Sequence, residues 1–189
     1  MRGSKFTQIQ KQYKYEKDKN TYLIEVSLDD YDDVYDTWDP APFKKRFIEE
    51  EFDDFIVSSS EDIPYDFNTV IVLYIPESKK DTSRENSVVL AYKNYYSYAV
   101  EKVERSLVKL NKKTVFYFLL ALLFLSLGYF FQSSIESVVL DVLEEGILIG
   151  GWVFLWEVFT NVFIKRREIQ NRYKLYRRIY NSNIRFIYS

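Results

Sequence analysis

The stretch GILIGGWVFLWEVFTNVFI, residues 146–164, decides the fold class of this chain. It is apolar throughout except for a few polar side chains, and Glu157 is its only ionisable residue. A transmembrane helix needs roughly 17–25 predominantly apolar residues, so the stretch is long enough to cross a bilayer. An ionisable group near a bilayer centre costs about 2.5–3.5 kcal/mol on insertion scales and normally faces protein or water. We therefore expect the helix face that carries Glu157 to be an interface.

A second apolar stretch, residues 114–131 (TVFYFLLALLFLSLGYFF), carries no charge. The connector between the two stretches, residues 132–145, has four acidic residues and no basic one. Cytoplasmic loops carry the excess of lysine and arginine, so both termini are predicted to be cytoplasmic and the connector to face outward. The flanking bases are Lys102, Arg105, Lys109, Lys112 and Lys113 before the first stretch, and Lys165, Arg166, Arg167, Arg172, Lys174, Arg177 and Arg178 after the second.

Two alternatives stay open at this level. The apolar stretches could be buried helices of a soluble protein, although such strongly polarised flanking charge is unusual there. The connector has apolar residues at helical spacing, so it is expected to form either an amphipathic helix or an outward extension of the second span.

Composition excludes several classes of function. Cysteine and histidine are absent, which removes disulfides, thiol and imidazole nucleophiles and the usual zinc ligand sets. No glycine occurs between Gly3 and Gly128, so the soluble part cannot form a phosphate-binding glycine loop. We therefore expect no enzyme, no cofactor and no metal.

Charge is distributed unevenly along the chain. Residues 29–66 hold fourteen acidic and three basic residues, whereas residues 165–189 hold eight basic and one acidic. The acidic run at residues 29–39 fails the EF-hand pattern, because Val34 occupies a ligand position and the turn glycine is missing. A solvated acidic loop is the expected structure.

The soluble part shows a strand, helix and strand order. Residues 22–28 and 69–75 are rich in β-branched and aromatic residues and predict strands, and residues 43–57 predict a helix between them. Residues 184–188 predict a third strand that pairs beside the first two. A capping box formed by Thr82 and Glu85 predicts the start of a helix that continues into the first span. Its apolar stripe is Val88, Tyr92, Tyr95, Ala99, Val103, Leu107 and Leu110.

The predicted fold class is an α+β membrane protein. It has a two-helix transmembrane hairpin, a small cytoplasmic α/β domain (β-α-β plus a C-terminal strand) and long helical stalks. The predicted segments are the cytoplasmic domain (1–82), stalk helix (83–113), first span (114–131), connector (132–145), second span (146–164), and basic helix with closing strand (165–189).

The polar residues of the second span share one helical face. At 100° per residue its members fall within about 100° of one another. In a structural interpretation this face packs against the first span or another subunit, and Thr160, Asn161 or a partner binds Glu157. In a functional interpretation subunits surround an ion path lined by Glu157 and Asn161. The candidate residues are Gly146, Gly150, Glu157, Thr160 and Asn161.

The basic run after the second span also has two interpretations. It could anchor the topology and contact anionic membrane lipid, or it could bind an anionic ligand such as a nucleotide or oligonucleotide. The candidate residues are Lys165, Arg166, Arg167, Arg172, Lys174, Arg177 and Arg178.

Two motifs carry a resemblance. They are Asp39-Pro40-Ala41-Pro42-Phe43 and Ile149-Gly150-Gly151-Trp152, the latter continuing through Leu155-Trp156-Glu157. Together they resemble a group of small bacterial two-span membrane proteins without assigned activity, which implies the two-span layout and no functional residues. The size and layout also resemble membrane effectors of anti-phage systems.

The predicted function is that of a homo-oligomeric ion channel or pore-forming effector of the bacterial inner membrane. Its cytoplasmic domain would regulate the ion path, and one form of the hypothesis gives this domain an anionic ligand such as a nucleotide or oligonucleotide. A role in anti-phage defence is part of the same hypothesis. The alternative is a non-conducting membrane scaffold or regulatory subunit that recruits a cytoplasmic partner protein.

Overall fold

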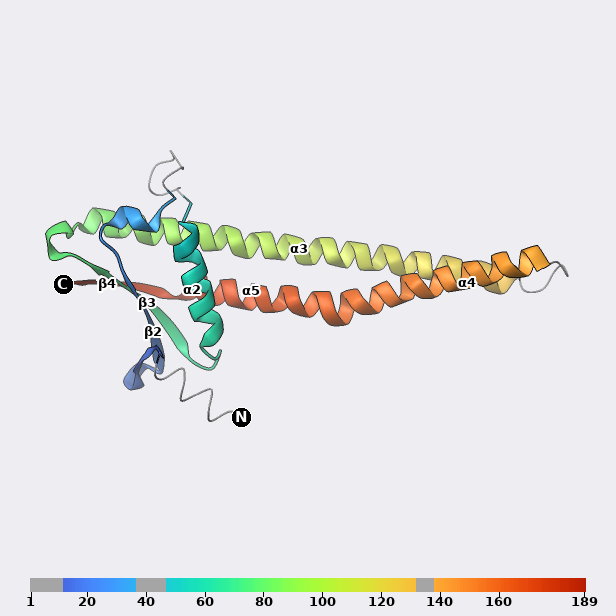
Figure 1. Ribbon diagram of the computed structural model, residues 1–189, viewed down its shortest axis with the longest axis horizontal. Helices are drawn as coiled ribbons and strands as arrows, with labels where there is room; N and C mark the ends of the chain where they lie inside the picture. Colours follow the sequence, from blue (N-terminus) through green and yellow to red (C-terminus); the bar gives the residue numbers. More distant parts are fainter. Residues whose placement is uncertain (1–11, 37–46, 132–137) are drawn as a thin grey trace. The chain divides into compact units, whose positions relative to one another are not determined.

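The computed structural model describes residues 12–36, 47–131 and 138–189. It has an α+β fold that combines a small mixed sheet with long helices (Figure 1). The elements are β1 (Lys14–Glu16), η1 (Lys17–Lys19), β2 (Thr21–Ser27), η2 (Tyr31–Val34), α2 (Glu50–Asp62), β3 (Asn68–Ile75), η4 (Glu77–Lys79), α3 (Thr82–Phe131), α4 (Val138–Phe159), η5 (Thr160–Lys165), α5 (Arg166–Asn181) and β4 (Asn183–Tyr188).

The chain forms two compact units. The first contains Met1–Glu101 and Tyr173–Ser189 and holds the whole sheet. The second contains Lys102–Arg172, which includes most of α3, all of α4 and η5 and the start of α5. The chain therefore leaves the first unit through α3 and returns to it through α5.

The sheet confirms the three strands expected from β-branched and aromatic runs. Its order is β1-β2-β3-β4, with β2, β3 and β4 parallel and β1 antiparallel to β2. Ile24, Ile71 and Ile184 lie side by side across the three parallel strands. The C-terminal strand thus pairs with β3, as predicted. The edge strand β1 escapes prediction because its sequence, KYE, shows no apolar alternation.

One face of the sheet carries the core of the first unit. Ile24, Ile71 and Leu73 on this face are at most 1% exposed. Burying one such aliphatic side chain contributes about 1.5–3 kcal/mol. Helices α2, α3 and α5 supply the other side of the core through Phe52, Ile56, Val88, Tyr92, Tyr96, Leu175 and Ile179.

The buried face of α3 is wider than the predicted stripe. Val88 and Tyr92 lie in the core as predicted, but Tyr96 is also fully buried and Tyr95 only partly. The hydroxyl of Tyr92 donates a hydrogen bond to the backbone oxygen of Ile179 in α5, at 2.7 Å. Because α3 packs against α5 as well as the sheet and α2, a single helical stripe underestimates its buried surface.

Asp53 of α2 joins the same region of α3. Its carboxylate accepts hydrogen bonds from the hydroxyls of Tyr96 at 2.6 Å and Tyr95 at 3.1 Å. Burial raises the pKa of the Asp53 carboxyl, and the two hydroxyl donors offset that rise in part. The buried carboxylate is therefore paired with donors and links α2 to α3.

The N-cap of α3 lies one residue before the predicted one. The side chain of Asp81 accepts the backbone N–H groups of Ser83 at 2.8 Å and Arg84 at 3.3 Å. These bonds satisfy free N–H groups of the first turn, as an N-cap does. The predicted capping box of Thr82 and Glu85 is therefore wrong, although the helix begins where it was expected.

The helix between β2 and β3 starts later than predicted. It was expected at residues 43–57 and is observed as α2, Glu50–Asp62. Ile48 forms an isolated antiparallel bridge with Tyr35 instead of a helical turn. Glu49 then caps α2, because its side chain accepts a backbone N–H of the first turn.

Two predicted features lie partly or wholly outside the described residues. The turn at residues 39–43 is one, and residues 132–137 of the connector are the other. Residues 138–145 form the beginning of α4. This part of the connector is therefore an extension of the second apolar helix.

Arg178 joins α5 to the C-terminal end of α2. Its guanidinium donates to the backbone oxygens of Ser60 at 3.0 Å, Ile63 at 2.6 Å, Pro64 at 3.1 Å and Phe67 at 2.9 Å. The last carbonyls of a helix lack intrahelical partners, and positive charge is favourable beside them. Burial lowers the pKa of Arg178. This side chain is used within the fold.

Replacing Arg178 with methionine removes these bonds while keeping an unbranched apolar stem. Since hydrogen bonds to charged groups contribute about 1.5–3 kcal/mol and leave buried acceptors unpaired when lost, we expect about 2–4 kcal/mol of destabilisation. The measurement is thermal unfolding in detergent, followed by circular dichroism.

Arg177→Met is the matched control. Arg177 is exposed, and its guanidinium donates a hydrogen bond to the hydroxyl of Tyr173 in the same helix. Its loss should change stability by less than about 0.5 kcal/mol. Equal unfolding midpoints for the two variants would contradict the role assigned to Arg178.

Candidate functional site

The second unit exposes a large apolar surface. Helix α3 and the helical segment Val138–Asn181 are both long and apolar enough to cross a membrane. In the most apolar window of each, 11% of the residues are buried. Bulky side chains that are at least 44% exposed include Phe116, Phe118, Leu119, Leu123, Trp152, Trp156 and Phe163.

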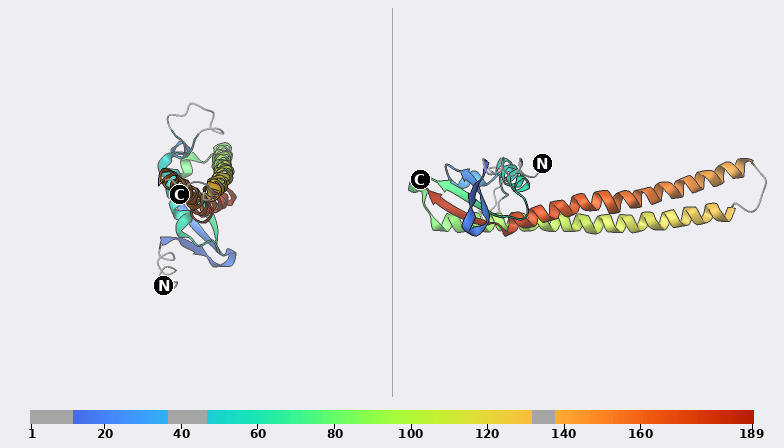
Figure 2. Two further views of the ribbon diagram at one scale, coloured as in Figure 1. Left: turned by 90° about the vertical axis from the view of Figure 1, so that its right-hand side faces the viewer. Right: turned by 90° about the horizontal axis from the view of Figure 1, so that it is seen from below.

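Helices α3 and α4 pack antiparallel in this unit, and glycines mark their contact (Figure 2). A Cβ added at Gly151 would lie 2.8 Å from the Leu125 side chain and 3.1 Å from its backbone nitrogen. A Cβ at Gly128 would overlap the side chain of Leu148. Small residues let helices approach closely in lipid, where packing drives association. The contact at Gly151 leaves the least room for a side chain, because backbone as well as side-chain atoms of α3 lie against it.

The residues of the predicted polar face of the second span have different surroundings. Gly150 contacts α3, because a Cβ there would lie 3.0 Å from Phe124, and Asn161 is fully buried. Gly146, by contrast, has open space around it. Gly151, predicted to point away from this face, is buried. A helical wheel groups residues by angle but does not locate the partner helix, which here contacts both adjacent glycines.

Glu157 pairs with a lysine of its own helix. Its carboxylate lies 3.3 Å from the ammonium of Lys165, and the two side chains are 38% and 40% exposed. The expected bonds from Thr160 and Asn161 are absent. The hydroxyl of Thr160 donates instead to the backbone oxygen of Trp156 at 3.0 Å. The ion pair is therefore partly exposed.

Asn161 lies in a π-helix. Thr160–Lys165 forms this element, η5, between α4 and α5. Asn161 is 0% exposed, and neither polar atom of its side chain has a hydrogen-bond partner among the described residues. An unpaired buried amide costs about 1–3 kcal/mol, and π-helical turns frequently occur at functional sites. The sequence shows that Asn161 is a polar residue in an apolar stretch, but no residue type in that stretch predicts a π-helix.

The basic residues after the second span have different surroundings. Arg178 is bound to α2, Lys165 pairs with Glu157, and Arg177 donates to Tyr173. The other predicted residues are exposed, with no hydrogen-bond or ion-pair partner in the described parts of the chain. They are Arg166, Arg167, Arg172 and Lys174.

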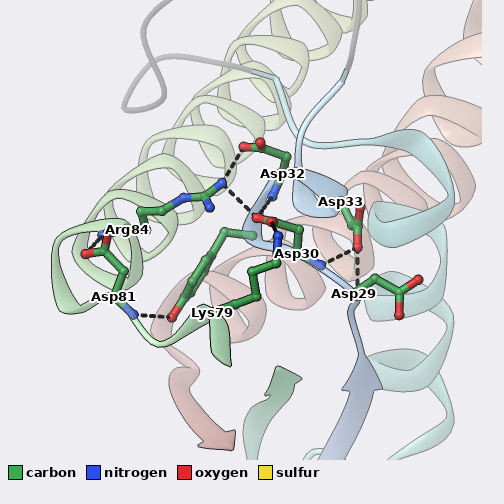
Figure 3. Close-up of polar contacts among 8 residues, drawn as sticks. Asp29, Asp30, Asp32, Asp33, Lys79, Asp81 and Arg84 are labelled. Carbon is green, nitrogen blue, oxygen red and sulfur yellow. Dashed lines mark hydrogen bonds and ion pairs between the residues drawn. The ribbon is translucent and has the colours of Figure 1, made fainter. Parts of the chain in front are cut away.

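The acidic segment after β2 is a capped turn and not merely a solvated loop (Figure 3). Asp30 caps η2 by accepting the backbone N–H of Asp32. Asp33 accepts the backbone N–H groups of Asp29 and Asp30, each at 2.9 Å. Residues 29–35 of the expected loop therefore have a defined local structure, which the hydrogen bonds of Asp30 and Asp33 stabilise.

Two cations bind this turn from the sequence that follows β3. Arg84 lies 2.8 Å from Asp30 and 2.9 Å from Asp32, and Lys79 lies 2.9 Å from Asp30 (Figure 3). The hydrogen bond from Lys79 is the largest cause that lowers the pKa of Asp30, to about 2. Among the described residues no group of acidic side chains is arranged to hold a metal ion. The turn links the end of β2 to the start of α3.

These features define an α+β protein with two apolar helices, a buried unpaired amide and a partly exposed ion pair. Comparisons with protein-family models, curated proteins and solved structures found no match to the chain.

The glycine contact can be tested by comparing Gly151→Ile with Gly146→Ile. Isoleucine at position 151 would overlap Leu125, and overpacking of this kind costs about 1–3 kcal/mol or more. The same side chain at position 146 meets open space. We expect a lower unfolding midpoint in detergent for Gly151→Ile only. Equal destabilisation by both substitutions would contradict the observed helix contact.

Proposed function

We propose that this protein is a homo-oligomeric ion channel or pore-forming effector of the bacterial inner membrane, regulated through its cytoplasmic domain. The observation that carries the proposal is that the side chain of Glu157, within an apolar helix, is 38% exposed. The sheet unit would be the cytoplasmic domain, and neighbouring copies would surround the ion path.

Membrane insertion is supported by the exposure of both apolar helices. A core helix of a soluble protein would be mostly buried, whereas 11% of each apolar window is buried here. Contiguous apolar patches on soluble monomers rarely exceed a few hundred Å². Removing apolar surface from water stabilises a protein by about 25 cal/mol per Å². Insertion into lipid would therefore be favourable for this surface.

The orientation is supported by connectivity and by charge. The segments before and after the two apolar helices belong to one compact unit, so they would lie on the same side of a membrane. The lysines before the first span and Arg166, Arg167 and Arg172 after the second are exposed, and they flank the two span ends that connect to the sheet unit. The positive-inside rule makes that side the cytoplasm.

An assembly of several copies is supported by the position of Glu157. This carboxylate lies seven residues inside the predicted end of the span, at residue 164, and its side chain stays 38% exposed. Charged groups in membrane helices generally face a protein interior or a water-filled cavity. Two helices enclose no channel, so an ion path requires further copies whose Glu157 side chains form a carboxylate ring that favours cations.

Planar-bilayer recordings of the purified full-length chain would test the ion path. We expect cation-selective currents, and Glu157→Gln should lower the cation-to-anion permeability ratio several-fold because it removes the ring charge. Glu168→Gln is the matched control, since Glu168 is an exposed acid beyond the predicted span. Currents that are insensitive to Glu157→Gln would contradict its role. No conductance, with or without nucleotides and anionic lipid, would overturn the ion path.

A second candidate is a non-conducting scaffold or regulatory subunit. The observation that favours it is the pairing of Glu157 with Lys165, which neutralises the carboxylate without a pore. Such a protein would recruit a cytoplasmic partner through exposed acidic residues of the sheet unit. Native mass measurement separates the two candidates, because a stable monomer cannot form a two-span channel.

The exposed bases Arg166, Arg167, Arg172 and Lys174 are proposed to bind anionic lipid or an anionic ligand such as a nucleotide. Arg178 is left out of this group because four backbone oxygens bind it. A role in anti-phage defence is proposed only because the size and layout of the chain resemble those of membrane effectors of anti-phage systems.

A further inference from the structure

The outward face of α2 is acidic. Phe52 and Ile56 face the core, and the opposite side of the helix carries exposed acids. At 100° per residue these acids fall within about 100° of one another. They have no ion-pair partner in the described part of the chain. They are Glu50, Glu51, Asp54 and Glu61.

The outward face of α5 in the same unit is basic. Leu175 and Ile179 are buried in the core, and Lys174 and Arg177 lie exposed on the other side of the helix. Arg178, one residue further, donates to Ser60 and Ile63 at the C-terminal end of α2. The acidic and basic faces therefore belong to two helices that meet within one unit.

We propose that the acidic face of α2 binds the basic face of α5 in a second copy of this chain. The proposal rests on the membrane orientation in the proposed function. Copies anchored in one bilayer and related by an axis along its normal keep equal heights. Since Arg178 of α5 contacts the C-terminal end of α2 within each copy, this end of the acidic face in one copy lies near the level of the basic face in the next.

Charge complementarity favours the basic face of α5 in a second copy as the partner of the acidic face of α2. Like surfaces of two copies would bring acids against acids or bases against bases, which is unfavourable. The acid-to-base contact joins two different surfaces, so it is heterologous, and heterologous contacts generate rings when the rotation closes. A closed ring is the assembly that an ion path requires. Single exposed ion pairs contribute little, but confinement to one membrane raises the effective concentration of the faces.

Cysteine cross-linking in membranes tests the contact, because the chain contains no cysteine. Ser58 and Asn181 are exposed, uncharged residues on the outward faces of α2 and α5, so replacing them leaves the charges intact. Differently tagged Ser58→Cys and Asn181→Cys chains would be co-expressed and oxidised in isolated membranes. We expect a mixed dimer, whereas each variant expressed alone should give none.

Charge reversal then tests the cause. Lys174→Glu with Arg177→Glu in the Asn181→Cys chain should lower the mixed-dimer yield about fivefold or more. Adding Glu51→Lys and Asp54→Lys to the Ser58→Cys chain should restore it, which also shows that the reversed chains fold. An unchanged yield after reversal would overturn the proposal, as would dimers from either single-cysteine chain alone.

Native mass of the same membranes keeps the two proposals distinguishable. An oligomer without mixed cross-links would overturn the α2–α5 contact and leave the proposed function standing, with α2 free or bound by another protein. A monomer would overturn both.

Discussion

The pairing of β4 with β3 is the constraint on which the rest of the structure depends. The two strands are parallel neighbours, with Ile71 beside Ile184, yet the whole second unit separates them in sequence. The chain that leaves through α3 must therefore return through α5 to the same sheet. In a bilayer this return demands an even number of crossings, and it puts the sheet unit and both described ends of the chain on one side.

The return path has its own physical requirements. Two helices that pack in lipid gain no hydrophobic driving force from each other, so close contact at Gly151 and Gly128 supplies the packing. Further along the same helical segment, Asn161 is fully buried and the Glu157 side chain is 38% exposed. The Asn161 amide is thus buried with no hydrogen-bond partner in the described parts of the chain, and Glu157 is paired with Lys165 at the predicted cytoplasmic end of the span. The buried amide and the ion pair therefore both lie within residues 157–165.

Local sequence patterns predicted the strands well because their cause is local. Runs of β-branched and aromatic residues gave β2, β3 and β4, whereas β1 exists only because β2 is beside it. The N-cap of α3 was missed by one residue, since Asp81 accepts the N–H groups of Ser83 and Arg84 and Thr82 already belongs to the helix.

The candidate site was harder to predict because its arrangement depends on neighbours. The apolar run and Glu157 are visible in the sequence, but the partner helix decides that Gly151 is buried and Gly146 is open. The role of Arg178 was hidden for the same reason, because its partners are backbone oxygens of a distant segment. The π-helix at Asn161 has no residue signature.

The central claim is that two helices cross a membrane and leave the sheet unit in the cytoplasm. Single cysteines at Glu145, near the predicted outer end of the second span, and at Ser78, beside the sheet, test it in spheroplasts with a membrane-impermeant maleimide. The account predicts labelling of Glu145→Cys in intact spheroplasts and of Ser78→Cys only after permeabilisation. Equal labelling of both cysteines in intact spheroplasts, or of neither before permeabilisation, would contradict it.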